Sequence, residues 1–239
     1  MRDDIIPYSK EKVSWPECGS EPVVLGPILP EADRDMLSKW KVNMLRDEAD
    51  YHNHISKSNT HTPYIDPGLV SSHTTYASFL TRLHDAGMVR WRCSSGGKGA
   101  LGIFFVKKKD GSLRIIFDTR VLNQRFQDPP KTHLPTAAAF SNLESEDGLP
   151  LYMAAGDIRN AFYAFEVPED LSDMFTLPSI PARFLNITQI DNVPISPNTH
   201  ITPCLRDLPM GWNWSLHLCQ TMMAHQVSLS IGHHRFFTD

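Results

Sequence analysis

Basic side chains gather around one predicted tight turn, between two apolar, β-branched runs of the chain. Lys107–Lys109 precede the dipeptide Asp110-Gly111, and Arg114 follows it. The glycine supplies the positive φ that a tight hairpin turn needs. Lysine and arginine near the tip of a hairpin suit an anionic ligand such as a phosphate chain, because they donate charge-assisted hydrogen bonds to phosphate oxygens. Such bases are also common around a solvated β-turn, so this segment alone is compatible with both interpretations.

A single carboxylate, Asp157, ends the mostly apolar run 151–156 and is followed by the aromatic pair Phe162-Tyr163. Carboxylate oxygens at the ends of rigid elements are suitable ligands for a hard cation such as Mg²⁺. An aspartate that ends a strand is also a common turn former or helix cap. The position of Asp157 therefore fits a metal ligand and fits a structural role.

Proline and glycine mark the start of a helix in the C-terminal part of the chain. The segment Pro209-Met-Gly211 precedes a predicted helix over 216–229. Around this start, Trp214, Leu218 and Met222 recur at helical spacing, which indicates one buried face. We expect these three side chains in the core rather than in a binding site.

In this order and at these distances, the three segments resemble the fingers and palm of a retrotransposon-type (retroelement) reverse transcriptase. The basic hairpin with its continuation Arg120-x-x-Asn123 is similar to the fingers strands of the family. Asp157-x-x-x-Ala161-Phe162 is similar to motif A, and Leu208-Pro-x-Gly-Trp212 through Gln220 is similar to motif B. The resemblance covers residues 70–235. It implies an α+β fold of the right-hand polymerase type, with fingers and an incomplete palm.

The resemblance implies an RNA-directed DNA polymerase, a nucleotidyltransferase that adds deoxynucleotides to a primer on an RNA or DNA template. The positions that match nucleotide-binding residues of the family are Lys108, Arg114, Phe162, Gly211 and Trp212. In the family, the two bases hold the triphosphate and the aromatic residue crowds a ribose 2′-hydroxyl. The glycine and tryptophan form a tight turn beside the template and the nucleotide. Met210 occupies a variable position where a methionine cannot donate the hydrogen bond that polar residues make in some relatives.

Asp157 matches the catalytic motif A aspartate, which holds both magnesium ions in the intact family enzyme. Two ions activate the primer 3′-hydroxyl and stabilise the leaving pyrophosphate, and one aspartate cannot hold both. The family adds motif C, an aromatic-x-Asp-Asp hairpin, after the motif B helix. The segment Phe237-Thr-Asp239 fits the start of motif C and fits a loop that precedes it. In both cases we expect a fragment that is inactive alone, and the alternative function is a non-catalytic nucleic-acid-binding remnant.

Together with the resemblance, the pattern along the chain divides it into three parts. Residues 1–69 are expected to form a poorly ordered N-terminal extension with one amphipathic helix. That helix lies around 31–51, where apolar residues recur at helical intervals: Leu37, Trp40, Met44 and Leu45. Residues 70–156 are expected to form the fingers-like part of the reverse transcriptase domain, and residues 157–239 a partial palm that contains motifs A and B.

Further elements are predicted within these parts. Apolar residues at helical spacing predict a helix that ends at Gly87: Tyr76, Phe79, Leu80 and Leu83. A strand over 88–93 is predicted to follow it. Residues 178–204 are rich in Pro, Asn, Thr and Ile and predict an insertion or a long hairpin between two palm strands.

Composition limits the functions that the chain can have. The 239 residues carry a net charge of −4, which argues against a broad nucleic-acid-binding surface. Residues 90–131 nevertheless hold ten Lys and Arg against three Asp, which suits a local phosphate site. The four cysteines form no C-x-x-C pair, so we expect reduced thiols. With no recognisable signal peptide and no apolar run of membrane-spanning length, we expect an intracellular protein, nuclear or cytoplasmic, without a membrane partner.

Overall fold

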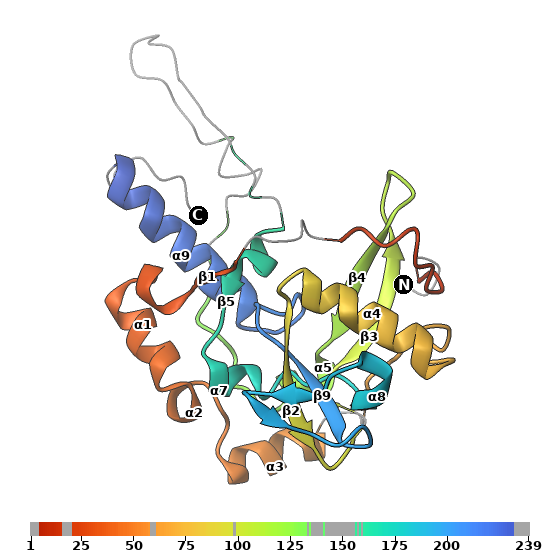
Figure 1. The fold of residues 1–239 in the computed structure, drawn as a ribbon. Coiled ribbons are helices and arrows are strands. Elements are labelled where there is room, and N and C mark those ends of the chain that lie inside the picture. The colour runs from red at the N-terminus through yellow and green to blue at the C-terminus, as the bar shows by residue number, and fades with distance from the viewer. Residues whose placement is uncertain are drawn as a thin grey trace, which may run out of the picture.

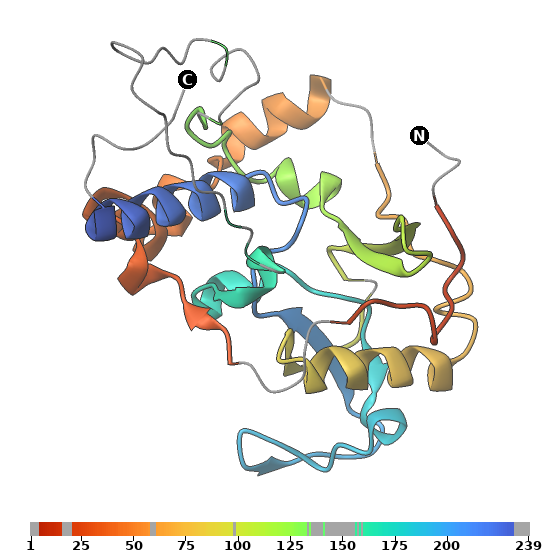
Figure 2. The ribbon, with the colours of Figure 1, turned by 90° about the horizontal axis from the view of Figure 1, so that it is seen from above.

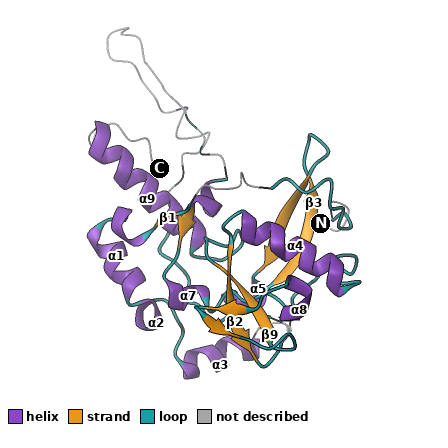
Figure 3. Ribbon diagram, viewed as in Figure 1, coloured by secondary structure: helices purple, strands orange, loops and turns teal. Residues whose placement is uncertain are grey.

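The structure is a computed structural model that describes residues 5–15, 21–57, 61–97, 99–132, 134, 141, 156, 158 and 160–231. It combines helices with small sheets and belongs to the α+β class (Figure 1 and Figure 3). The α-helices are α1 (Glu31–Ser38), α2 (Trp40–Asn43), α3 (Glu48–Lys57), α4 (His73–Asp85), α5 (Arg120–Asn123), α7 (Glu169–Ser172), α8 (Ala182–Leu185) and α9 (Ser215–Ile231). Short 3₁₀ helices are η1 (Gly26–Ile28) and η3 (Ala161–Ala164).

Within the described residues, the strands pair in four small sheets. One antiparallel sheet has three strands in the order β2 (Val89–Ser94), β9 (His200–Leu205) and β6 (Ile180–Pro181). Strands β3 (Gly102–Lys107) and β4 (Leu113–Asp118) form an antiparallel hairpin. Parallel pairing joins β1 (Val23–Val24) to β5 (Phe165–Glu166), and antiparallel pairing joins β7 (Gln189–Ile190) to β8 (Val193–Pro194).

The β3–β4 hairpin confirms the prediction from the Asp110-Gly111 dipeptide. Gly111 has φ 84°, and the Asp110 carboxylate accepts hydrogen bonds from the backbone N–H and the hydroxyl of Ser112 at 2.9 and 2.6 Å. An aspartate that accepts from the residue two positions on is a standard way to close a turn. The register pairs Val106 with Arg114, so the bases before and after the turn lie near the same end of the hairpin.

Helix α4 confirms the predicted apolar stripe. All four of its predicted core residues are buried: Tyr76, Phe79, Leu80 and Leu83. The Ser72 side chain caps the helix by accepting a hydrogen bond from the Thr75 N–H at 3.0 Å, which satisfies one of the free donors at the helix start. Gly87, with φ 72°, follows the end of the helix and turns the chain toward β2.

The N-terminal part differs from the single helix in a poorly ordered extension that the sequence predicts. Residues 31–57 form α1, α2 and α3, and the chain leaves helical geometry around Lys39 and Met44. Residues of this region belong to the same buried cluster as the rest of the molecule, among them Leu25, Leu29, Leu37, Trp40 and Met44. The Trp40 indole N–H also donates to the Asp170 carboxylate in α7 at 3.1 Å. The region is therefore held against the rest of the molecule by buried apolar side chains. Their partners lie far away in the sequence.

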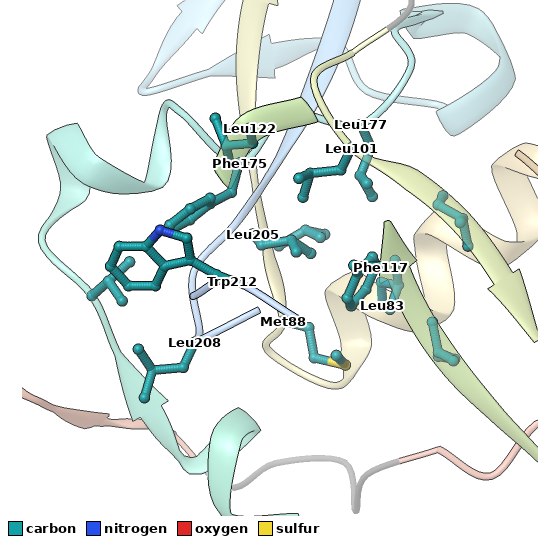
Figure 4. Packing of buried hydrophobic residues seen from close by; sticks show 14 of the residues in the cluster. Leu83, Met88, Leu101, Phe117, Leu122, Phe175, Leu177, Leu205, Leu208 and Trp212 are labelled. Atoms are coloured by element: carbon teal, nitrogen blue, oxygen red, sulfur yellow. The ribbon is translucent and has the colours of Figure 1, made fainter. Parts of the chain in front are cut away.

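The hydrophobic core draws on segments from Val13 near the N-terminus to Met222 in α9. Figure 4 shows side chains from α4, β4, β9 and the segment before α9 packed together, including Leu83, Phe117, Leu205 and Trp212. The predicted helix over 216–229 is confirmed as α9, and its expected core residues Trp214, Leu218 and Met222 are buried. Seen from above, α4 and α9 run on different sides of the molecule, and η3 lies between them (Figure 2).

Residues 178–204 form a long hairpin with further elements inserted in it. Ile180 of β6 pairs with Ile201 of β9, and α8 and the β7–β8 hairpin lie between these two strands in the chain. Asp191 and Asn192 turn β7 into β8 with φ values of 49° and 64°, which asparagine and aspartate tolerate better than most residues.

Two further observations concern the cysteines and the helices of the described residues. Cys93, Cys204 and Cys219 carry free thiols. Within the described ranges, no helix has both the length and the apolar character to cross a membrane.

Candidate functional site

A cavity of about 310 Å³ lies where four separate segments of the chain meet. The hairpin contributes Lys108 and Arg114, the first residues of the η3 region contribute Asn160 and Phe162, and the segment before α9 contributes Met210. Ser14, from the N-terminal segment, completes the polar part of the lining. The cavity therefore has basic side chains on one part of its wall and apolar side chains on another.

The hairpin turn determines where the two bases lie. The backbone N–H of Lys108 donates to the Ser112 carbonyl at 2.8 Å, and the backbone N–H of Gly111 donates to the Lys108 carbonyl at 3.0 Å. These bonds fix the backbone on both sides of the turn. The Lys108 ammonium lies 3.2 Å from the Ser14 hydroxyl and 3.6 Å from the Asp110 carboxylate. Hydrogen bonds from Ser112, helped by Lys108, lower the pKa of Asp110. Lys108 and Arg114 thus present positive charge to the cavity.

The aromatic part of the lining comes from η3. Asn160 precedes this helix with φ 55°, a left-handed conformation that asparagine tolerates, and its carbonyl accepts the Tyr163 N–H at 2.9 Å. Phe162 and Tyr163 follow and both line the cavity. The Tyr163 hydroxyl lies 3.5 Å from the Ile115 carbonyl of β4, and burial raises the pKa of Tyr163 well above its usual range. Tyr163 is therefore a neutral wall residue that ties η3 to the hairpin.

A tight turn before α9 presents Met210 to the cavity. Gly211 adopts φ 114°, and a Cβ added there would lie 3.1 Å from the Thr119 hydroxyl and 3.2 Å from the Phe117 carbonyl. The side chain of Asn123 in α5 stabilises the turn by two hydrogen bonds. Its amide donates to the Gly211 carbonyl at 2.9 Å and accepts from the Asn213 N–H at 3.2 Å. Glycine is required here by backbone conformation and by close approach to β4.

Trp212 packs into the core instead of lining the cavity. Its side chain is 2% exposed, and its ring lies 5.2 Å from Phe126 and 5.1 Å from Phe175 in edge-to-face geometry. Of the three residues Met210, Gly211 and Trp212, it is Met210 whose side chain forms part of the cavity wall. Gly211 and Trp212 therefore shape and anchor the turn.

The carboxyl group of Asp207 is buried just before this turn. Asp207 is 0% exposed, and among the described residues neither of its carboxylate oxygens has a hydrogen-bond partner. Burial raises the pKa of Asp207 well above its usual range, because low-dielectric surroundings penalise the ionised form. The next residue, Leu208, donates its N–H to the Phe162 carbonyl at 3.2 Å, so the turn and the aromatic wall are joined at this point.

The expected metal ligand is Asp157. Asp157 lies outside the described residues, as does the segment Phe237-Thr-Asp239, although the neighbour Ile158 lines the cavity. Within the described part of the chain, no group of three His, Cys, Asp or Glu side chains lies close enough to hold a metal ion. The described side chains thus do not provide a ligand set for two magnesium ions, and Mg²⁺ stays an expectation.

A second cavity, of about 420 Å³, is larger but contains none of the residues that the motifs single out. Its arginines already have partners: Arg90 contacts Glu166 at 2.8 Å, Arg206 contacts Glu166 at 3.1 Å, and Arg92 contacts Asp173 at 2.9 Å. Because these charges are neutralised locally, the second cavity has a weaker attraction for an anion than the cavity at Lys108 and Arg114. We therefore take the smaller cavity as the candidate functional site.

Neither a protein-family model nor a curated protein matches this chain. The family resemblance rests on the motifs of the sequence and on their order and spacing. The motifs did not indicate Ser14, Asn160 or Tyr163 as parts of the site. Asn160 and Tyr163 adjoin Phe162 in the sequence, so that motif was the available signal for them, whereas no pattern in the sequence points to Ser14.

Proposed function

We propose that the chain is the fingers and part of the palm of an RNA-directed DNA polymerase of the reverse transcriptase type, and that its cavity receives the triphosphate of a deoxynucleotide. The observation that carries the proposal is the convergence of Lys108, Arg114, Phe162 and Met210 on one cavity. These residues come from three segments that are far apart in the sequence, and the resemblance assigns all of them to the neighbourhood of the same nucleotide.

The chemistry of the lining suits a nucleotide. Arg114 can bind two phosphate oxygens at once through its planar guanidinium, and Lys108 adds a point charge on a flexible stem. Phe162 and Met210 offer apolar surface for a sugar and a base, and Phe162 is placed by the motif as the group that crowds a 2′-hydroxyl. Met210 cannot donate a hydrogen bond, so its contribution is contact alone.

In the intact enzyme, this nucleotide would be added to a primer on an RNA or DNA template. Magnesium would neutralise the triphosphate and activate the primer hydroxyl, with Asp157 as the expected ligand. The described residues bind and orient the triphosphate and the sugar.

The alternative is a nucleic-acid-binding remnant without catalysis. The exposed bases Lys107 and Lys109 beside the hairpin turn favour it, because a phosphate backbone needs accessible positive charge rather than a cavity. The two functions differ in which lysines matter. A nucleotide site depends on Lys108 and Arg114, whereas a backbone-binding surface depends on the exposed bases as well.

The test measures dATP binding to the full chain in the presence of Mg²⁺, with a fluorescent dATP analogue. Charge-assisted hydrogen bonds contribute about 1.5–3 kcal/mol each, so Lys108→Ala combined with Arg114→Ala should weaken binding by at least about 10-fold. The matched control is the double variant Lys107→Ala with Lys109→Ala, which removes the same charge outside the cavity and should retain binding.

Equal losses in the two double variants would contradict the proposed nucleotide site. Salt-sensitive binding of an oligonucleotide that both double variants weaken, without dATP binding, would support the remnant instead. Weaker discrimination between dATP and ATP after Phe162→Ala is expected only if the sugar lies beside this ring.

A further inference from the structure

The N-terminal segment 5–15 lies against both strands of the hairpin. The Ile6 N–H donates to the Phe105 carbonyl of β3 at 3.0 Å. On the other strand, the Leu113 N–H donates to the Lys12 carbonyl at 2.7 Å, and the Ser14 N–H donates to the Leu113 carbonyl at 2.8 Å. We call this segment the N-terminal strap. Because it bonds to β3 and to β4, it restrains the end of the hairpin from which Lys108 and Arg114 extend.

Aromatic contacts hold the strap against the body of the domain. The ring of Tyr8 lies 5.8 Å from Phe79 of α4 and 5.2 Å from Phe105 of β3. Trp15, at the other end, lies 5.5 Å from the same Phe79, and Val13 between them is buried. Aromatic pairs of this kind add to the stabilisation from burial. Ser14 thus lies between a buried residue and an aromatic anchor, with its backbone bonded to β4.

This placement brings the Ser14 hydroxyl to the candidate site. Ser14 lines the 310 Å³ cavity, and its Oγ accepts a hydrogen bond from the Lys108 ammonium at 3.2 Å. Asp110 competes for the same ammonium at 3.6 Å on the side of the hairpin turn. Both Ser112 hydrogen bonds end on Oδ1 of Asp110, whereas the ammonium approaches Oδ2, at a separation longer than that of a hydrogen bond. Ser14 is the partner that also belongs to the cavity wall.

We infer that Ser14 is a positioning residue for phosphate binding by Lys108 and Arg114. It holds the Lys108 ammonium at the cavity, where an anionic ligand would bind. A lysine stem has several rotatable bonds, and fixing its end before binding reduces the entropy that binding must overcome. The identity of the ligand as a nucleotide rests on the proposed function. The positioning itself concerns any chain of phosphates that enters the cavity.

The experiment measures dissociation constants of the full chain for inorganic tripolyphosphate and for dATP. Ser14→Ala removes one hydrogen bond to the Lys108 ammonium, so it should weaken tripolyphosphate binding by about threefold. Ser14→Thr retains the hydroxyl and should restore the affinity. Ser9→Ala, on the same strap but outside the cavity lining, should bind as the unchanged protein does. Thermal unfolding midpoints of all variants check that the fold is retained.

A double-mutant cycle separates positioning from a general structural effect. In a chain that carries Lys108→Ala, Ser14→Ala should have no further effect, because the group that Ser14 positions is absent. An equal loss in both backgrounds, an unchanged affinity of Ser14→Ala, or a failure of the unchanged protein to bind tripolyphosphate would overturn the inference. If tripolyphosphate binds with the expected dependence on Ser14 but dATP binds no better, the positioning stands and the proposed nucleotide function fails.

Discussion

Replacing Asp207 by asparagine is expected to remove a pH-dependent cost of folding. The carboxyl group is buried and, among the described residues, its oxygens have no hydrogen-bond partner. Asparagine has nearly the same shape and carries no ionisable group, so the substitution removes the titration while it keeps the packing. The cost is notable because Asp207 lies directly before the turn that presents Met210 to the candidate site.

The sign and the size follow from proton linkage. Burial raises the pKa of Asp207 in the folded protein well above the 3.8 of an unperturbed aspartate, which applies to the unfolded chain. Between these two pKa values, the folded state holds one proton that the unfolded state has released. The free energy of unfolding therefore falls as the pH rises, by about 1.4 kcal/mol per pH unit for this group. Above the folded-state pKa the loss is complete, and below 3.8 it is absent.

The assay is urea unfolding of the full chain and of Asp207→Asn, at pH values from about 4 to about 8. The variant should gain stability relative to the unchanged protein as the pH rises, and the gain should shrink toward the acidic end. A fixed offset from the new amide shifts the whole curve and does not change its slope. Parallel curves for Asp207→Asn and the unchanged protein would refute the reasoning.

Two further predictions concern the backbone, one at the start of β3 and one at the Gly211 turn. Gly102→Ala would put a Cβ 2.1 Å from the Tyr64 carbonyl oxygen, so thermal unfolding should show a loss of about 3 kcal/mol, whereas Gly97→Ala has open space and should change little. Asn123→Ala removes both hydrogen bonds at the Gly211 turn and should cost about 1–2 kcal/mol, with faster hydrogen exchange of the Asn213 amide. Asn123→Asp keeps the acceptor for that amide, so similar exchange in both Asn123 variants would contradict the assigned contact.

Local patterns in the sequence predict the elements whose cause is local. The Asp110-Gly111 dipeptide forms its turn through bonds that span two to four residues, and the stripe in α4 buries one helical face. Helix α9 likewise follows from the spacing of its apolar residues. In each case a short stretch contains the information that the structure uses, since turns and amphipathic helices depend on near neighbours.

The N-terminal part could not be predicted in this way, because its order depends on distant partners. An apolar period that continues through residues 31–51 predicts one helix, yet Met44 and Leu45 leave the helix to meet another segment. The Leu45 backbone bridges to Phe126, and the Arg46 N–H donates to the Arg125 carbonyl at 2.9 Å. Such pairing is decided by the tertiary structure and overrides the helical period. The same holds for the N-terminal strap, whose sequence contains no periodic pattern.

The residues that resemble motif B show what a motif can predict about a site. The resemblance predicts Gly211 and Trp212 beside a nucleotide, whereas in the structure the turn that they form lies at the cavity and the Trp212 ring packs in the core. A motif therefore indicates which backbone reaches a site, because glycine and tryptophan fix the turn, but it does not specify which side chains touch a ligand. Ser14 is the converse case, a side chain at the cavity that belongs to no motif. If the strap positions Lys108, one residue that supports phosphate binding lies outside the segment that resembles the polymerase family. Variants of Ser14 test its contribution independently of the motifs.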